Sequence, residues 1–166
     1  MTHSSAKIDP GPGFYAALHR ALSALFEGER DPIANTANMA ALVYQEMDRV
    51  SWAGFYFRRG SDLVLGPFQG PPACIRIPWG EGVCGRAAQS GQILRVDNVD
   101  DFPGHIACDP RARSELVIPF WSAGSVVGVF DLDSYAASRF QESDQTGLAA
   151  CVRLLEGAVD WHPTLM

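Results

Sequence analysis

The sequence has no long hydrophobic run. No stretch of its 166 residues approaches the roughly 20 apolar residues of a membrane-spanning helix. The first ten residues also lack the apolar core and the cleavage pattern of a signal peptide. We therefore expect no membrane partner and a cytoplasmic location. Disulfides are rare in that compartment unless they are catalytic or redox-sensing, so the four cysteines of the chain need an explanation.

Basic residues are few and scattered. The chain has 13 Lys and Arg against 19 Asp and Glu, for a net charge of −6. No basic run or stripe could follow a phosphate backbone, so we expect no nucleic-acid partner. The apolar content of 47% is typical of a folded soluble chain, and the length suits one domain with a proper core.

Helical periodicity marks both ends of the chain. Gly28 follows a first helical pattern, where a C′ glycine is common. Asp31 and Pro32 then form a typical N-cap and first-turn pair for a second helix. The predicted helices span residues 12–27, 31–48 and 142–159.

Between these helices the pattern is that of β-strands separated by turns. Strands are predicted at residues 52–57, 63–68, 74–77, 93–96, 116–121 and 125–132, with a turn at 58–61, a short helix at 83–89 and a long ordered loop at 97–114. Two leading helices, paired strands and a closing helix predict an α+β fold, with a central antiparallel sheet flanked by helices.

The cysteines fall into two groups. Cys151 lies among apolar residues of the closing helix and is expected to be a small buried hydrophobe. Cys74, Cys84 and Cys108 all border loops, which leaves three interpretations open: core thiols, a zinc site completed by His105, or redox chemistry. The ten residues between the first two cysteines argue against zinc, since structural sites draw ligands from tighter pairs.

A reactive cysteine needs a thiolate, whose formation depends on nearby charge. Cys84 opens the predicted short helix, and a helix N-terminus lowers a thiol pKa. Cys108 is followed by Asp109, which opposes the effect of Arg111 and Arg113. The balance at Cys108 stays open at this stage.

Three carboxylates fall in the second predicted strand pair. Asp131 and Asp133 share one face of a strand, because side chains repeat every two residues. A three-residue hairpin loop at 122–124 sets Glu115 opposite Asp131, whereas a two-residue loop turns Glu115 to the other face. We predict the three-residue loop.

Like charges facing one another destabilise a sheet, so this cluster has two interpretations. The acids are solvated at a sheet end, or they bind a cationic group of a ligand, with one carboxyl holding a raised pKa and a proton to donate. Trp52, Tyr56 and Trp79 either pack in the core and loops or complete the walls of such a site.

Three motifs carry a resemblance to a known family: LVLGPFQGPPACIRIPWGEGVCG, LRVDNVDDFPGHIACDPRARSELVIP and GVFDLDS. Over residues 12–160 the chain resembles the free methionine-(R)-sulfoxide reductases, a catalytic branch of the GAF fold. We accordingly expect a flexible N-terminus at 1–11, a GAF-like catalytic domain at 12–160 and a tail at 161–166.

The resemblance implies reduction of free L-methionine-(R)-sulfoxide to methionine, recycled by a thioredoxin-type reductant, without a metal or organic cofactor. It assigns the catalytic nucleophile to Cys108, resolving cysteines to Cys74 and Cys84, substrate-binding carboxylates to Glu115, Asp131 and Asp133, and pocket aromatics to Trp52 and Tyr56. Our mechanistic hypothesis is that Cys108 attacks the sulfoxide sulfur while Glu115 donates a proton.

Other function classes remain as alternatives. The first is a non-catalytic GAF module that senses a small ligand, because fold alone does not settle function. The second is a structural zinc protein. The sequence also leaves open which of Cys74 and Cys84 resolves, whether the loop at 97–114 closes on the substrate, and whether the first helix pairs two chains into a homodimer.

Overall fold

The computed structural model describes residues 7–161. In this part the helices are α1 (Phe14–Phe26), α2 (Pro32–Glu46), α3 (Gly82–Ser90) and α4 (Glu142–Ala158), with a short 3₁₀ helix η1 (Val99–Asp101). The strands are β1 (Trp52–Arg59), β2 (Asp62–Gln69), β3 (Arg76–Pro78), β4 (Leu94–Val96), β5 (Ser114–Ser122) and β6 (Ser125–Ser134). No helix in residues 7–161 is long and apolar enough to cross a membrane. Residues 1–6 and 162–166, which hold most of the predicted N-terminal segment and tail, lie outside the described part.

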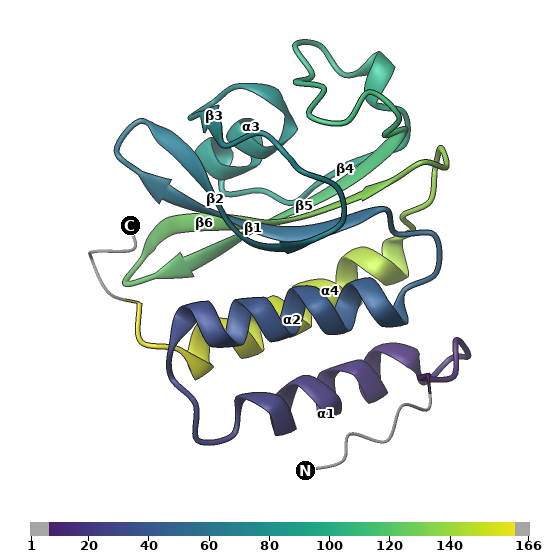
Figure 1. Cartoon of the computed structure of the whole chain (residues 1–166), viewed down its shortest axis with the longest axis vertical. Helices are drawn as coiled ribbons and strands as arrows, with labels where there is room; N and C mark the ends of the chain where they lie inside the picture. Colours follow the sequence, from purple (N-terminus) through teal and green to yellow (C-terminus); the bar gives the residue numbers. More distant parts are fainter. Residues whose placement is uncertain (1–6, 162–166) are drawn as a thin grey trace.

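The strands form one antiparallel sheet in the order β3-β2-β1-β6-β5-β4. Helices α1, α2 and α4 lie on one side of this sheet, whereas α3 and the segment 97–113 lie on the other (Figure 1). The predicted α+β class, with a central antiparallel sheet between helices, is confirmed.

The helical side holds the larger core. Phe55 of β1 stacks on Phe130 of β6 with ring centroids 4.5 Å apart, and both rings are fully buried. Leu18 and Leu22 of α1 join the same cluster, as the helical spacing requires. The predicted cap of α2 is present, because the Asp31 side chain accepts a hydrogen bond from the backbone N–H of Ala34 at 2.9 Å.

The opposite side of the sheet holds a smaller core that supports the site. Tyr56, Val117 and Val129 point to this side and pack with Val83 and Ala87 of α3. The central strand β1 is therefore buried on both faces from Trp52 to Phe57. Such a strand is rigid, which suits it to position side chains at its end.

The hairpin between β5 and β6 differs from the prediction. Its loop has two residues, Ala123 and Gly124, both in the left-handed region with φ of 47° and 77°. This pair of angles is typical of a two-residue type I′ turn, which matches the twist of the strands. The predicted three-residue loop is wrong because alanine gives little indication of a positive φ.

A bulge next to the turn changes the register again. Two pairings, Trp121 with Val126 and Phe120 with Gly128, leave one extra residue on β6. Farther along, Glu115 pairs with Asp133, two residues beyond the partner that we predicted. Because the two shifts add up to two residues, Glu115 stays on the face of the aspartates.

Three smaller boundaries also differ from the prediction. Strand β1 continues to Arg59, which pairs with Asp62, so only Gly60 and Ser61 form the turn. Strand β3 begins at Arg76 and not at residue 74, because the preceding residues form the connection from β2. The predicted loop at 97–114 contains η1 and ends at residue 113, because β5 begins at Ser114.

Candidate active site

A narrow recess lies between α3, the segment 97–113 and the sheet. Its lining includes Trp52, Tyr56, Cys84, His105, Cys108, Glu115, Asp131 and Asp133. The structure thus brings together all the predicted site residues except Cys74, which is bonded to one of them. The cavity volume is about 30 Å³, room for about two water molecules and not for an amino acid. An amino acid can therefore bind only if the recess widens.

Burial raises the pKa values of the three carboxylates. Glu115 and Asp131 are each only 6% exposed, and burial raises the pKa of Asp131 to about 7. Burial and the charge of Asp131 raise the pKa values of Glu115 and Asp133 well above the usual range. Among the described residues, Oδ1 of Asp131 has no hydrogen-bond partner. Without a cation the cluster therefore favours protonated carboxyls, and a cationic group placed against it would stabilise their ionised forms.

These raised pKa values predict a pH-dependent stability. A carboxyl whose pKa is higher in the folded state stabilises the fold below its unfolded pKa, and this contribution is lost as the pH rises through the folded value. We expect Asp131→Asn to raise the Tm at pH 8 by at least about 2–4 °C, the shift that about 1 kcal/mol produces in a protein of this size, because ionising a carboxyl with a raised pKa destabilises the fold. At pH 4 the two proteins should differ much less.

The measurement is thermal unfolding followed by circular dichroism at both pH values. Asp48→Asn is the control, because the side chain of Asp48 is exposed, pairs with Lys7 at 3.8 Å and does not line the recess. It should leave the pH dependence unchanged. An equal loss of Tm between pH 4 and pH 8 in the wild type and in Asp131→Asn would contradict the assignment.

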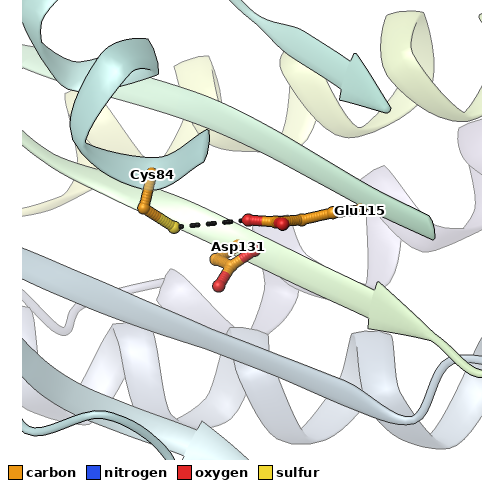
Figure 2. Close-up of side chains that lie close together, drawn as sticks. All are labelled: Cys84, Glu115 and Asp131. Carbon is orange, nitrogen blue, oxygen red and sulfur yellow. Dashed lines mark hydrogen bonds between the residues drawn. The ribbon is translucent and has the colours of Figure 1, made fainter. Parts of the chain in front are cut away.

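Cys84 faces these carboxylates from the first turn of α3. Its Sγ lies 3.7 Å from Oε1 of Glu115, with Asp131 beside both side chains (Figure 2). We predicted that the helix N-terminus would lower its pKa, and this is wrong. Burial, followed by the charges of Asp131 and Glu115, raises the pKa of Cys84 well above its usual value. Cys84 is therefore a buried thiol and not a thiolate in this state.

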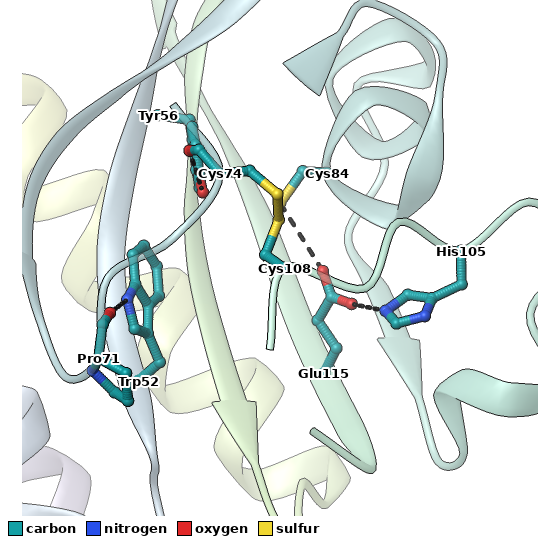
Figure 3. The surroundings of a disulfide bond; sticks show 8 residues. All are labelled: Trp52, Tyr56, Pro71, Cys74, Cys84, His105, Cys108 and Glu115. Carbon is teal, nitrogen blue, oxygen red and sulfur yellow. Dashed lines mark hydrogen bonds and ion pairs between the residues drawn. A yellow bond between two sulfur atoms is a disulfide. The ribbon is translucent and has the colours of Figure 1, made fainter. Parts of the chain in front are cut away.

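Cys74 and Cys108 form a disulfide, with their Cα atoms 5.2 Å apart (Figure 3). The bond joins the connection after β2 to the segment 97–113, which the sequence separates by 34 residues. Two of the four ligands considered for zinc are thus bonded to each other in this state. Within residues 7–161, the group that could hold a cation is instead Cys84, Glu115 and Asp131, whose ligand atoms lie within 4.8 Å of one another.

Asp109 and Arg111, two charged neighbours of Cys108, pair with each other. Arg111 donates to both carboxylate oxygens of Asp109, at 3.0 and 2.9 Å, which lowers the pKa of Asp109 to about 2. The hydroxyl of Tyr135 donates to the same carboxylate at 2.9 Å. These contacts attach the residue after Cys108 to the end of β6. Sequence reasoning missed the role of Tyr135, because no pattern links it to the distant loop.

His105 and the aromatic residues complete the surroundings of the recess. Nε2 of His105 lies 3.8 Å from Oε2 of Glu115, and burial lowers the pKa of this histidine. Trp52 donates from Nε1 to the carbonyl oxygen of Pro71 at 3.1 Å, which fixes its ring at the wall.

The other two aromatic candidates have different positions. The hydroxyl of Tyr56 donates to the carbonyl oxygen of Cys74 at 3.0 Å. Trp79 is not part of the recess, since its ring lies 4.2 Å beneath the guanidinium of Arg58. Its packing interpretation is the correct one. Cys151 is fully buried in α4, as predicted.

Comparison with known proteins identifies the family. The GAF domain family matches residues 21–159. The free methionine-R-sulfoxide reductase of Escherichia coli is 46% identical over 143 residues, which cover 86% of this chain and 87% of that protein. The chain belongs to the GAF domain family, in the branch of the free methionine-R-sulfoxide reductases. The YtsP protein of Bacillus subtilis is also similar, at 50% identity over 87% of this chain and 90% of that protein.

Comparison with solved structures gives the same family. An X-ray structure of the Neisseria meningitidis free methionine-R-sulfoxide reductase with its substrate superposes with a TM-score of 0.90 at 38% identity. The match covers 95% of this chain and 95% of that chain. The family and fold implied by the sequence motifs are therefore confirmed.

Proposed function

We propose that this GAF domain reduces free methionine-R-sulfoxide to methionine by cysteine redox chemistry. The observation that carries the proposal is the recess, in which a disulfide-forming cysteine, Cys108, lies with two buried carboxylates, Glu115 and Asp131, and the half-buried Asp133. The names of the relatives point to the same activity. A ligand-sensing module needs no such cysteine.

The carboxylates account for a free amino acid as substrate. In the proposed complex, Asp131 and Asp133 bind the α-ammonium group. This group gives a cationic partner to Oδ1 of Asp131, which has no hydrogen-bond partner among the described residues. A methionine sulfoxide within a peptide has no such charge to offer. The ring of Trp52, held by its bond to Pro71, forms the wall for the apolar methyl end.

The chemistry begins with both cysteines reduced. The thiolate of Cys108 attacks the sulfoxide sulfur, and Glu115 donates a proton to the oxygen. The oxygen passes to Cys108 as a sulfenic acid, and methionine leaves. A second thiol then condenses with the sulfenic acid, which forms a disulfide and releases water. Cys74 is our choice for this thiol, because it is the residue bonded to Cys108.

Cys84 has a different place in this scheme. Its buried thiol has a raised pKa and lies against Glu115, so it is a poor nucleophile at neutral pH. We assign it to the wall of the recess, beside the proton donor. Dimedone labelling tests this choice, since Cys74→Ser should accumulate the sulfenic acid of Cys108 and Cys84→Ser should not. Accumulation only in Cys84→Ser would make Cys84 the resolving residue.

The activity itself is tested by consumption of the two epimers of free methionine sulfoxide with dithiothreitol as reductant. Turnover of the R-epimer alone is the expected result. Well-folded reduced protein that turns over neither epimer would favour the sensor alternative.

Asp133→Ala should mainly weaken substrate binding. Loss of one charged hydrogen bond costs about 1.5–3 kcal/mol, which corresponds to a KM raised about 10- to 100-fold with kcat changed much less. Steady-state kinetics with the free amino acid measure both constants. N-acetylmethionine-R-sulfoxide is the matched control substrate, because it has no ammonium group and should be used equally poorly by both proteins. An unchanged KM for the free amino acid would exclude this role of Asp133.

A further inference from the structure

The loop at 103–112, which carries Cys108, has one hydrogen bond to another segment. Within residues 7–161, the backbone hydrogen bonds of this loop stay inside the segment 97–113. The hydroxyl of Tyr135, in contrast, donates to Oδ2 of Asp109 at 2.9 Å from outside the segment. His105 approaches Glu115 only to 3.8 Å, which exceeds hydrogen-bond distance. When the disulfide is reduced, the contact with Tyr135 is therefore the hydrogen bond that still holds this loop.

Arg111 fixes the acceptor of this hydrogen bond. It donates to both oxygens of Asp109, and its guanidinium lies 4.8 Å from the centroid of the Tyr135 ring. Tyr135 thus contacts the loop twice, through its hydroxyl and through its ring. Because the pKa of Asp109 is lowered to about 2, the acceptor is ionised at neutral pH and the hydrogen bond to it is charge-assisted.

The backbone that carries Tyr135 is firmly held. Tyr135 directly follows Ser134, the last residue of β6, which is the strand of the two aspartates. Ser134 is fully buried, and its hydroxyl donates to the carbonyl oxygen of Arg49 at 2.6 Å. Its own carbonyl oxygen accepts from the N–H of Arg113 at 2.8 Å. The hydrogen bond from Tyr135 therefore fixes the loop of Cys108 relative to the acids of β6.

Asp109 connects this contact to the recess. It lines the recess together with Asp133, and its charge adds to the raised pKa of Asp133. Cys108, the residue before it, lines the same recess. A misplacement of about 1 Å can cost about 100-fold in rate, so the position of this loop matters for attack by a thiolate.

We propose that Tyr135 is a positioning residue, which acts through Asp109 to hold Cys108 against the acids of β6 after the disulfide is reduced. This inference rests on the proposed function, because it concerns the geometry of the attack on the sulfoxide sulfur. While the disulfide is closed, the covalent bond itself holds the loop. In the reduced protein, the hydrogen bond keeps the Cys108 sulfur at the recess and within reach of Cys74.

Tyr135→Phe tests this role, because it removes the hydroxyl and keeps the ring. Without the hydrogen bond, the thiols of Cys74 and Cys108 have a lower effective concentration, so their disulfide forms less readily. We expect the equilibrium constant for disulfide formation, measured in buffers of reduced and oxidised dithiothreitol, to fall about 5- to 10-fold, since an exposed hydrogen bond contributes less than a buried one. This corresponds to a reduction potential less negative by about 20–30 mV.

Tyr44→Phe is the matched control. Tyr44 is 38% exposed and lines the same surface groove as Tyr135. Its hydroxyl makes no hydrogen bond within residues 7–161, so its removal should leave the wild-type equilibrium constant. A constant that is unchanged in Tyr135→Phe, or lowered equally in Tyr44→Phe, would overturn the inference.

A double-mutant cycle shows whether Tyr135 acts through Asp109. If it does, adding Tyr135→Phe to Asp109→Ala should lower the equilibrium constant no further than Asp109→Ala alone. Independent effects would instead multiply. Multiplied effects would exclude Asp109 as the residue through which Tyr135 acts.

Steady-state kinetics test the consequence for the reaction. Tyr135→Phe should lower kcat for free methionine-R-sulfoxide about 5- to 10-fold and change KM much less, because the ammonium-binding acids stay on β6. A raised KM with an unchanged kcat would overturn the positioning of the nucleophile. The disulfide equilibrium needs no sulfoxide, so it tests this inference even if the wild type does not reduce free methionine-R-sulfoxide. The latter result would contradict the proposed function alone.

Discussion

Replacing Cys108 with serine is expected to abolish turnover of free methionine-R-sulfoxide, a loss of at least about 10³-fold, because a serine hydroxyl neither ionises at neutral pH nor accepts the oxygen as a sulfenic acid. The reductant should make no difference, since the block precedes disulfide formation. The measurement is methionine release with dithiothreitol and with thioredoxin. This change tests the nucleophile directly.

Cys151→Ala is the matched control for Cys108→Ser. Cys151 is a fully buried cysteine of α4 on the other side of the sheet, so its replacement affects packing and not the recess. We expect it to lower the Tm by a few degrees and to keep most of the activity. Substantial turnover by folded Cys108→Ser would show that another cysteine is the nucleophile.

Glu115→Gln should give the second-largest effect. Proton donation contributes about 10²–10⁴-fold to rate, so kcat should fall by about that factor. Burial and the neighbouring aspartates raise the pKa of Glu115 well above its usual value, which favours the protonated carboxyl that can donate. The wild-type kcat should therefore decline as the pH rises through the pKa of Glu115, and the variant should lack that decline.

Measurement of kcat from pH 6 to pH 9 separates proton donation from a structural role. Glu156→Gln serves as the control, because Glu156 is also partly buried but accepts a hydrogen bond from the backbone N–H of Trp121, far from the recess. It should keep the wild-type profile. A Glu115→Gln enzyme with a lower kcat but the same alkaline decline would assign the proton to another group.

The secondary structure could be predicted from local signals. Asp31 caps α2 and Gly28 takes a positive φ after α1, as their positions in the sequence indicate. The register of the β5–β6 hairpin could not be predicted, because it depends on a left-handed alanine at 123 and on a bulge in β6 opposite Phe120 and Trp121. Neither is encoded by periodicity, since both depend on how the strands twist and pack.

At the site, residue types and strand periodicity were enough to predict the chemistry and the shared face of Asp131 and Asp133. Asp131 and Asp133 point the same way because a strand repeats every two residues, and the motif around Cys108 identified the family. The pairing of Cys74 with Cys108 is visible only in the folded chain, as is the burial that, more than the helix N-terminus, sets the pKa of Cys84. Both depend on distances between segments far apart in the chain, and these exist only after folding.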